Sequence, residues 1–438
     1  MHNKKIFSWS ISVALAGFLF GFDTVVISGA NLPIKELWNT SPSFHGIFIM
    51  SMALWGTVIG SIFGSIPCDK IGRKSTLFWI GILFFISAVG SALAMDPYFF
   101  SFFRFIGGVG VGASTVASPT YISEISNKDN RGKLVALYQF NIVLGILIAY
   151  FSNFLLKDFG GDLDWRYMLG IEAIPAFFYI LSILSVPKSP RWLILFRDDI
   201  GSARKILSQI YDEKEVENKI LKIKNSIINK KSEKLFSGTF NYQIKLAFLL
   251  SFFNQLSGIN FVLYYAPEIL QTAGFGTSDS LMSSISIGFI NLIFTLVGLR
   301  LIDSYGRRNL MFIGSIGYII SLFTIGICFV YQLDSFILLF FILVFVASHA
   351  IGQGTVIWVF LSEIFPNHMR ASGQSFGTAV HWIFAALITA STPIVINLLG
   401  NNPGMVFYLF AIMMIFQLLF VVKMMPETKG ISLDKMNF

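Results

Sequence analysis

The chain alternates long apolar runs with short polar gaps. A helix needs roughly 20 apolar residues to cross the hydrocarbon core of a bilayer, and twelve runs approach that length. We expect an all-α membrane protein whose transmembrane helices lie near residues 7–30, 45–67, 76–94, 98–121, 133–156, 168–187, 244–270, 281–302, 309–331, 335–359, 372–398 and 404–424.

One long polar segment, residues 188–243, divides the runs into six and six. Isoleucines recur in it at helical spacing, namely Ile206, Ile210, Ile220, Ile223 and Ile227. We therefore expect a cytoplasmic helical linker between two bundles. The predicted domains are an amino-terminal six-helix bundle at 1–187, the linker at 188–243, a carboxy-terminal six-helix bundle at 244–424 and a cytoplasmic tail at 425–438.

Composition supports a lipid environment. Hydrophobic residues make up 55% of the chain and charged residues only 13%, about half the share of a soluble domain. The first apolar run is too long for a cleavable signal peptide. The two cysteines, Cys68 and Cys328, lie in different segments, so they provide neither a disulfide framework nor metal-ligand spacing.

The basic residues predict the orientation. With the N-terminus inside, all but four of the 32 Lys and Arg residues fall on the cytoplasmic side of the predicted spans. The exceptions are Lys35, Arg104, Lys157 and Arg166. Cytoplasmic loops carry such an excess, so topology explains the net charge of +8 without a nucleic-acid partner.

The two halves repeat a loop motif. CDKIGRK follows the second span and IDSYGRR the eighth, and a Glu-to-Arg spacing of seven residues recurs after the fourth and tenth. Matched motifs at matched positions indicate an internal repeat. We expect these charges to pair across the cytoplasmic face and hold it shut. The predicted gate residues are Asp69, Arg73, Glu124, Arg131, Arg191, Asp303, Arg307, Arg308, Glu363 and Arg370.

Further motifs follow in order: PTYISEI, SPRW, QLSGIN, SEIFP and PETKG. With them the chain resembles the sugar porters of the major facilitator superfamily, close in pattern to bacterial proton-coupled pentose and hexose symporters and to animal glucose facilitators. The resemblance implies two pseudo-symmetric six-helix bundles, alternating access and a central sugar site.

Span 7 concentrates polar side chains around Gly258, which lets the helix deform toward a ligand. Amides donate and accept hydrogen bonds at once, which suits sugar hydroxyls, and Trp rings offer flat apolar faces. The predicted sugar-binding residues are Gln139, Asn254, Gln255, Asn260, Tyr264, Asn291, Trp358, His381 and Trp382.

The resemblance places six of these residues on sugar-contacting positions of the family: Gln139, Gln255, Asn260, Asn291, Trp358 and Trp382. Asn254 stands where the family usually has Gln, and His381 where relatives carry Gln or Asn. These two departures leave the sugar open among xylose, arabinose, glucose, galactose and myo-inositol.

Asp23 lies inside the first apolar run, and Arg104 and Glu172 lie inside the fourth and sixth. Ionisable residues within spans are costly and are commonly functional. An Arg that approaches and leaves a buried carboxylate would make it release and bind a proton. In the sugar symporters that the chain resembles, the match to Asp23 is an acid, whereas facilitators commonly have Asn. We therefore expect these three residues to couple transport to protons, the alternative being a static ion pair.

Further residues depart from the family pattern, among them Ser304 and Ser65, which replace a usual base and a usual Gly in the repeated loop motif. Lys188 stands where the family typically has Glu, which removes an ion pair from the cytoplasmic gate. Thr355 replaces a usual Pro in span 10, so a kink there must come from Gly352 or Gly354.

We expect a proton-coupled monosaccharide symporter. The alternatives are a proton-independent facilitator, a myo-inositol or polyol symporter, and a non-transporting sugar sensor. An enzyme is disfavoured because the chain has no P-loop and no nucleophile elbow, and we expect no cofactor and no metal. The glycine-rich FIGGVGVGAS lies in mid-membrane, where small residues allow close helix packing. The expected partners are the sugar, the proton and the bilayer, with a monomer in a bacterial inner membrane and both termini in the cytoplasm.

Overall fold

The computed structural model describes residues 2–126, 130–225, 235–366, 369–400 and 402–430. Within these residues, twelve helical segments are long and apolar enough to cross a membrane, so the predicted number is confirmed. The spans of the first half are α1 (His2–Leu37), α2 (Pro42–Phe44) with η1 (His45–Met50) and α3 (Met52–Phe63), α5 (Arg73–Ala92), α6 (Pro97–Ile125), α7 (Arg131–Leu156), and α8 (Asp164–Gly170) with α9 (Ala173–Ser185). Short α4 (Ser65–Lys70) follows α3.

The second half repeats this plan. Its spans are α13 (Asn241–Leu256) with α14 (Ile259–Thr272), α15 (Thr277–Tyr305), α16 (Arg307–Val330), α17 (Ser335–His349) with η3 (Ala350–Gly354) and α18 (Thr355–Glu363), α19 (Arg370–Leu398), and α20 (Gly404–Lys423). The connecting segment contains α10 (Pro190–Arg197), α11 (Ile200–Leu207) and α12 (Glu213–Asn225). Ile227 of the predicted linker pattern lies outside the described residues.

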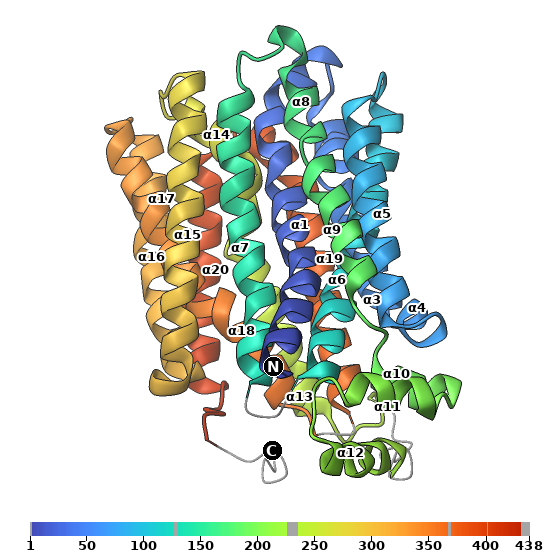
Figure 1. Cartoon of the computed structure of the whole chain (residues 1–438). Helices are drawn as coiled ribbons and strands as arrows, with labels where there is room; N and C mark the ends of the chain where they lie inside the picture. Colours follow the sequence, from blue (N-terminus) through green and yellow to red (C-terminus); the bar gives the residue numbers. More distant parts are fainter. Residues whose placement is uncertain (1, 127–129, 226–234, 367–368, 401, 431–438) are drawn as a thin grey trace.

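Helices α10, α11 and α12 lie together at one end of the bundle (Figure 1). We call this end the linker face and the opposite end the distal face. Helix α1 begins at the linker face, and α20 ends there (Figure 1).

Two spans are interrupted where the sequence predicts deformation. Gly258 lies between α13 and α14 with a φ of +82°. Gly adopts this left-handed conformation without a steric penalty. Span 10 contains the π-helical turn η3, and the Thr355 hydroxyl donates to the Ala350 carbonyl at 2.6 Å. The irregularity therefore includes both Gly352 and Gly354, which agrees with the predicted position of the kink.

The glycine-rich stretch of α6 packs closely against α3. Gly108 and Gly112 lie against the backbone of Ala53 and Thr57, where a Cβ atom would collide. This contact agrees with the predicted packing role and fixes the position of α6, which carries Arg104.

The halves meet toward the distal face. The Tyr150 hydroxyl of α7 donates to the Leu263 carbonyl of α14 at 2.8 Å, and Gly46 packs against the backbone of Ala390 in α19. Both contacts lie in the distal parts of their helices, so this conformation is closed at the distal face.

Candidate functional site

A buried ion pair joins α1 to α6. Arg104 Nη1 donates to Asp23 Oδ1 at 2.5 Å, and Arg104 Nη2 donates to the Asp23 carbonyl oxygen at 3.0 Å. Asp23 is 1% exposed and Arg104 2%. Gly107, one turn along α6 from Arg104, lies against Asp23 and Ser87, so the missing side chain leaves room for the pair. The sequence predicted that these residues act together, and the structure brings them into contact.

Glu172 is the third charged residue of this cluster. It lies at the break between α8 and α9, is 1% exposed and is close enough to Asp23 for a hydrogen bond. Its Oε1 atom has no hydrogen-bond partner among the described residues. Two buried carboxyl groups thus lie near one guanidinium, which contacts Asp23 and interacts electrostatically with Glu172. An uncompensated charge is costly in a low-dielectric interior, so the position of Arg104 relative to these two carboxyls matters for the stability of the cluster.

Tyr264 of α14 connects the charged cluster to the other half. It is 1% exposed, and it interacts electrostatically with Arg104 and Asp23. Asn260 precedes it by one helical turn and shares its face. The same helix therefore presents one residue toward the ion pair and another toward the predicted sugar site.

The amides of span 7 form one hydrogen-bonded chain. Asn260 Nδ2 donates to Gln255 Oε1 at 2.9 Å, and Gln255 Nε2 donates to Asn254 Oδ1 at 2.9 Å. Gln255 Nε2 also lies 3.0 Å from Nε2 of His381 in α19. All four side chains are buried. The left-handed turn at Gly258 places the end of α13 and the start of α14 around this chain.

Aromatic rings surround His381. Its ring centroid lies 5.0 Å from that of Trp358 and 4.8 Å from that of Trp382, and Trp382 also contacts Phe20 of the first half. Trp382 Nε1 is buried without a hydrogen-bond partner among the described residues. Flat apolar rings beside amide groups and an indole N–H donor suit a ligand that has both C–H faces and hydroxyl groups.

Gln139 lies on α7 and Asn291 on α15. These two helices pack against each other at the boundary between the halves. Asn291 of α15 is buried and lies one turn from Gly288, which packs against Tyr150 of α7. Gln139 is half-buried and shares a face of α7 with Tyr150, three turns nearer the linker face. Both therefore lie on helix faces directed toward the boundary between the halves.

The charged residues of the linker face pair within the first half. Arg73 Nη1 contacts Asp69 Oδ1 at 3.0 Å, and Arg73 Nη2 contacts Glu124 Oε1 at 3.0 Å. The Ser189 hydroxyl donates to Glu124 Oε2 at 2.5 Å, and Arg191 interacts electrostatically with Glu124.

The second half repeats this arrangement. Arg307 contacts Asp303 at 3.2 Å and both oxygens of Glu363, the closer at 2.8 Å. The Thr428 hydroxyl donates to Glu363 at 2.6 Å, in the role of Ser189 in the first half. Glu427 accepts N–H donors from the start of α16, including Arg307 at 2.9 Å. The roles of Thr428 and Glu427 were not predicted, although PETKG was visible as a motif.

These contacts correct one expectation. In this conformation the gate residues whose contacts are described pair within each half rather than across the face, because the Gly turn places each Arg beside the Asp four residues before it. Arg308 donates to the carbonyls of Val421 and Val422, within the second half. Arg370, half-buried, begins α19. The side chain of Arg131 lies outside the described residues.

A polar network at the distal face was not predicted. Glu268 of α14 accepts from Asn31 Nδ2 at 2.6 Å and from Lys35 Nζ at 3.5 Å, both on α1. Asn31 Oδ1 accepts from His45 Nε2 at 2.6 Å, and the Thr40 hydroxyl lies 2.8 Å from His45 Nδ1. We call these residues the distal latch. Its signal in the sequence was an acid near the end of an apolar run.

Twelve spans in two similar halves, with a polar cluster and a buried ion pair in the interior, define a membrane transporter. The model of the family of sugar (and other) transporters matches residues 9–438. The chain belongs to this family. Membership makes it a transporter rather than an enzyme, and within the described residues no group of three or more His, Cys, Asp or Glu could hold a metal ion.

Individual relatives cover nearly the whole chain. The arabinose-proton symporter of Bacillus subtilis (strain 168) is 36% identical, over 98% of this chain and 93% of the relative. The D-xylose-proton symporter of Escherichia coli (strain K12) is 34% identical, over 100% of this chain and 96% of the relative. The solved xylose transporter of E. coli, in a partially occluded inward-open conformation, matches with a TM-score of 0.87 at 33% identity, over 98% of this chain and 100% of that one. The all-α twelve-helix fold of the major facilitator superfamily is thereby confirmed.

Proposed function

We propose that the chain is a proton-coupled symporter of a monosaccharide, a pentose such as xylose or arabinose or a hexose such as glucose or galactose. The contact between Asp23 and Arg104, with Glu172 beside it, carries this proposal. A facilitator has no need of a buried acid in this place. The printed activities of the arabinose-proton and D-xylose-proton symporters support the same class of substrate and coupling ion.

Proton coupling follows from the geometry of the pair. With Arg104 at 2.5 Å, the Asp23 carboxylate is neutralised without a proton. When Arg104 moves away, the desolvated carboxylate takes a proton from the distal side. When Arg104 returns, Asp23 releases that proton toward the linker side. Glu172 lies near enough to exchange a proton with Asp23.

Sugar binding would affect the Asp23–Arg104 pair through α14. A sugar that hydrogen-bonds to Asn260 and Gln255 changes the position of this helix, and Tyr264 on the same helix faces the ion pair. A protonated Asp23 lets the pair separate, and a bound sugar draws α14 toward the other half. The cycle then requires both ligands before the halves rearrange.

The two halves, 1–187 and 244–424, act in this proposal as rigid bundles that rock about the central site. The closed distal face and the likeness to an inward-open transporter support an inward-facing state. The paired Asp23 is the deprotonated form expected there. In the outward-facing state, the charged groups of the two halves would approach each other at the linker face and hold it shut.

The chain is a multi-pass membrane protein. We further propose that it works as a monomer in a bacterial inner membrane, with the linker face and both termini in the cytoplasm. The excess of Lys and Arg on that side supports the orientation.

Uptake of labelled sugars into proteoliposomes tests the function. Xylose, arabinose and glucose are offered separately, with and without an imposed inward proton gradient. Accumulation above equilibrium that collapses with an uncoupler supports symport. Equilibration that ignores the gradient would make the protein a facilitator. Uptake of myo-inositol alone would identify a polyol symporter, and sugar binding without uptake a sensor.

A further inference from the structure

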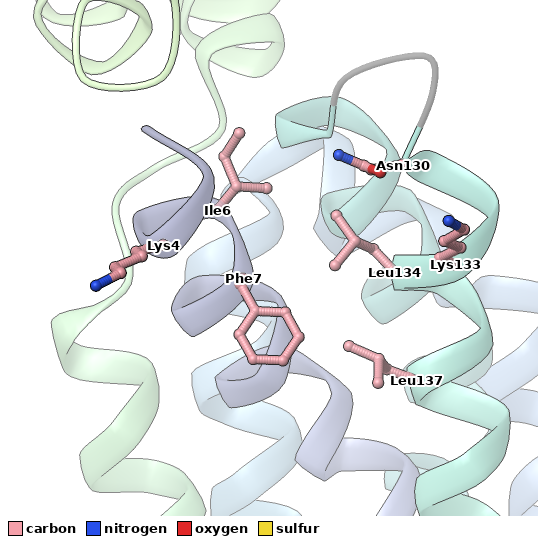
Figure 2. Close-up of a pocket in the computed structure, with 7 residues that line it drawn as sticks. All are labelled: Lys4, Ile6, Phe7, Asn130, Lys133, Leu134 and Leu137. Carbon is pink, nitrogen blue, oxygen red and sulfur yellow. The ribbon is translucent and has the colours of Figure 1, made fainter. Parts of the chain in front are cut away.

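A pocket outside the transport site opens between the starts of α1 and α7. It has a volume of about 460 Å³ and is lined by Lys4, Ile6, Phe7, Asn130, Lys133, Leu134 and Leu137. Its size falls in the range of small-molecule sites. Figure 2 shows Phe7 and Leu137 facing each other across the pocket, with Lys133 and Asn130 at the start of α7 and Lys4 at the start of α1, its side chain directed outward.

The pocket changes character with depth. Lys4 and Lys133 lie at the linker-face ends of spans that begin at Lys4 and Gly132. Phe7 and Leu137 lie one helical turn further into their spans, roughly 5 Å deeper at 1.5 Å per residue. In a bilayer, the two cations would thus lie at the level of the membrane surface, and the apolar side chains at the level of the acyl chains.

The apolar part of the pocket is only partly covered by the protein. Phe7 is 50% exposed on the protein, whereas Ile6 and Leu134 form a buried floor, at 3% and 7%. None of the seven lining residues is acidic, and the neighbouring Lys5 is directed to the linker, where it donates to Gln209. Lys4 and Lys133 therefore have no carboxylate partner within the pocket lining.

We propose that this pocket binds an anionic phospholipid from the leaflet on the linker side. Its phosphate would lie beside Lys133 and Asn130, with the Lys4 side chain turning in to meet it, and one acyl chain would cover Phe7 and Leu137. Basic pockets between transmembrane helices bind anionic headgroups by this chemistry. The pocket lining shares no residue with the amide cluster of span 7, so the proposal does not depend on which sugar, if any, is transported.

Native mass spectrometry of the full chain tests the proposal, with phosphatidylglycerol and phosphatidylcholine of identical acyl chains as probes. Each basic residue near an anionic lipid contributes roughly a fivefold preference. Lys4→Gln combined with Lys133→Gln should therefore lower the apparent affinity for phosphatidylglycerol about 25-fold and leave phosphatidylcholine unchanged. The matched control combines Lys5→Gln with Lys423→Gln, which remove the same charge at the linker face outside the pocket, and it should retain the preference.

A second variant tests the apolar part. Leu137→Trp fills the pocket without changing charge, so it should weaken the binding of both lipids. Soluble glycerol 3-phosphate should fail to displace phosphatidylglycerol, because it lacks the acyl chain. Equal losses in the pocket and control variants, or full displacement by glycerol 3-phosphate, would overturn the proposal.

Discussion

Lys188 takes in the first half the place that Glu427 holds in the second. Both residues follow a Pro after the last span of their half and precede a hydroxyl residue that donates to a gate glutamate. Glu427 accepts the backbone N–H groups of Arg307 and Arg308 at the start of α16. Lys188 lines a small pocket at the start of α5. Its positive charge there lies near the positive end of the helix dipole, which is unfavourable.

Lys188→Glu should stabilise the protein. A carboxylate at a helix start satisfies free N–H groups and interacts favourably with the helix dipole, for about 1 kcal/mol. Thermal unfolding in detergent should show a Tm higher by roughly 1–2 °C. Glu427→Lys, the matched reversal, should lower the Tm. An unchanged or lower Tm for Lys188→Glu would show that the two halves are not equivalent at this position.

The contribution of Glu427 should depend on pH. Burial by itself raises the pKa of this carboxyl, but N–H donors from Lys429, Arg307, Arg308 and Thr428 outweigh it and hold the pKa below its usual value of 4.5. A lowered pKa in the folded state stabilises the protein above pH 4.5, and that stability is lost as the pH falls through the folded value. The Tm difference between the wild type and Glu427→Gln should therefore be largest near pH 7 and shrink below about pH 4.5. Replacing the exposed Glu36 with Gln should change the Tm only slightly, both near pH 7 and below about pH 4.5.

The sequence predicted the features of this molecule that recur along the chain or that are energetically unfavourable unless they are compensated. Twelve apolar runs predicted twelve spans because the bilayer sets their length. Asp23 and Arg104 were predicted as a pair because an isolated charge inside a span is unfavourable. Gly258 predicted the break in span 7 because Gly alone adopts its backbone conformation freely.

Partner choice was harder to predict. The gate charges were expected to pair across the two halves, but Arg73 and Arg307 each find a nearer acid four residues before them. Which contacts form depends on the conformation of the bundle, and one sequence specifies several conformations. The contact of Glu268 with Asn31 and the hydroxyl donors Ser189 and Thr428 were missed because the partners lie far apart along the chain.

Loss of the Glu268 charge should open the distal latch. Glu268→Gln keeps the size of the side chain but weakens its bonds to Asn31 and Lys35, and a charged hydrogen bond is worth roughly 1.5–3 kcal/mol. Spin labels at Asp162 and Ser278, exposed on the distal ends of the two halves, should report a longer distance in a larger fraction of molecules.

The control for the latch is Glu36→Gln, which removes an exposed acid from the same end of α1. Its distance distribution should match that of the wild type. If Glu268→Gln also leaves the distribution unchanged, the closed distal face is held by helix packing at Gly46 and Gly288 rather than by the latch.

His381 should set the orientation of Gln255. His381→Phe keeps an aromatic ring between Trp358 and Trp382 but removes the nitrogen near Gln255, so a buried amide loses a partner, at roughly 1–3 kcal/mol. Sugar affinity, measured by equilibrium binding, should fall about tenfold or more. His381→Gln supplies a new acceptor and should recover most of that loss. Gln271→Ala, near the distal end of α14, should leave affinity unchanged; equal affinity in the wild type and His381→Phe would remove His381 from the sugar site.

Asp23→Asn should abolish proton-driven accumulation without abolishing sugar exchange. The amide cannot carry a proton through the cycle, yet it still accepts a hydrogen bond from Arg104, so the fold and the sugar site remain. Accumulation driven by a proton gradient should disappear, while exchange of labelled sugar across the membrane without a gradient continues. Asp162→Asn, at an exposed loop acid, should keep both activities. If Asp23→Asn still concentrates sugar, the contact between Asp23 and Arg104 is a static link between α1 and α6, and the proton must bind elsewhere, with Glu172 the next residue to replace.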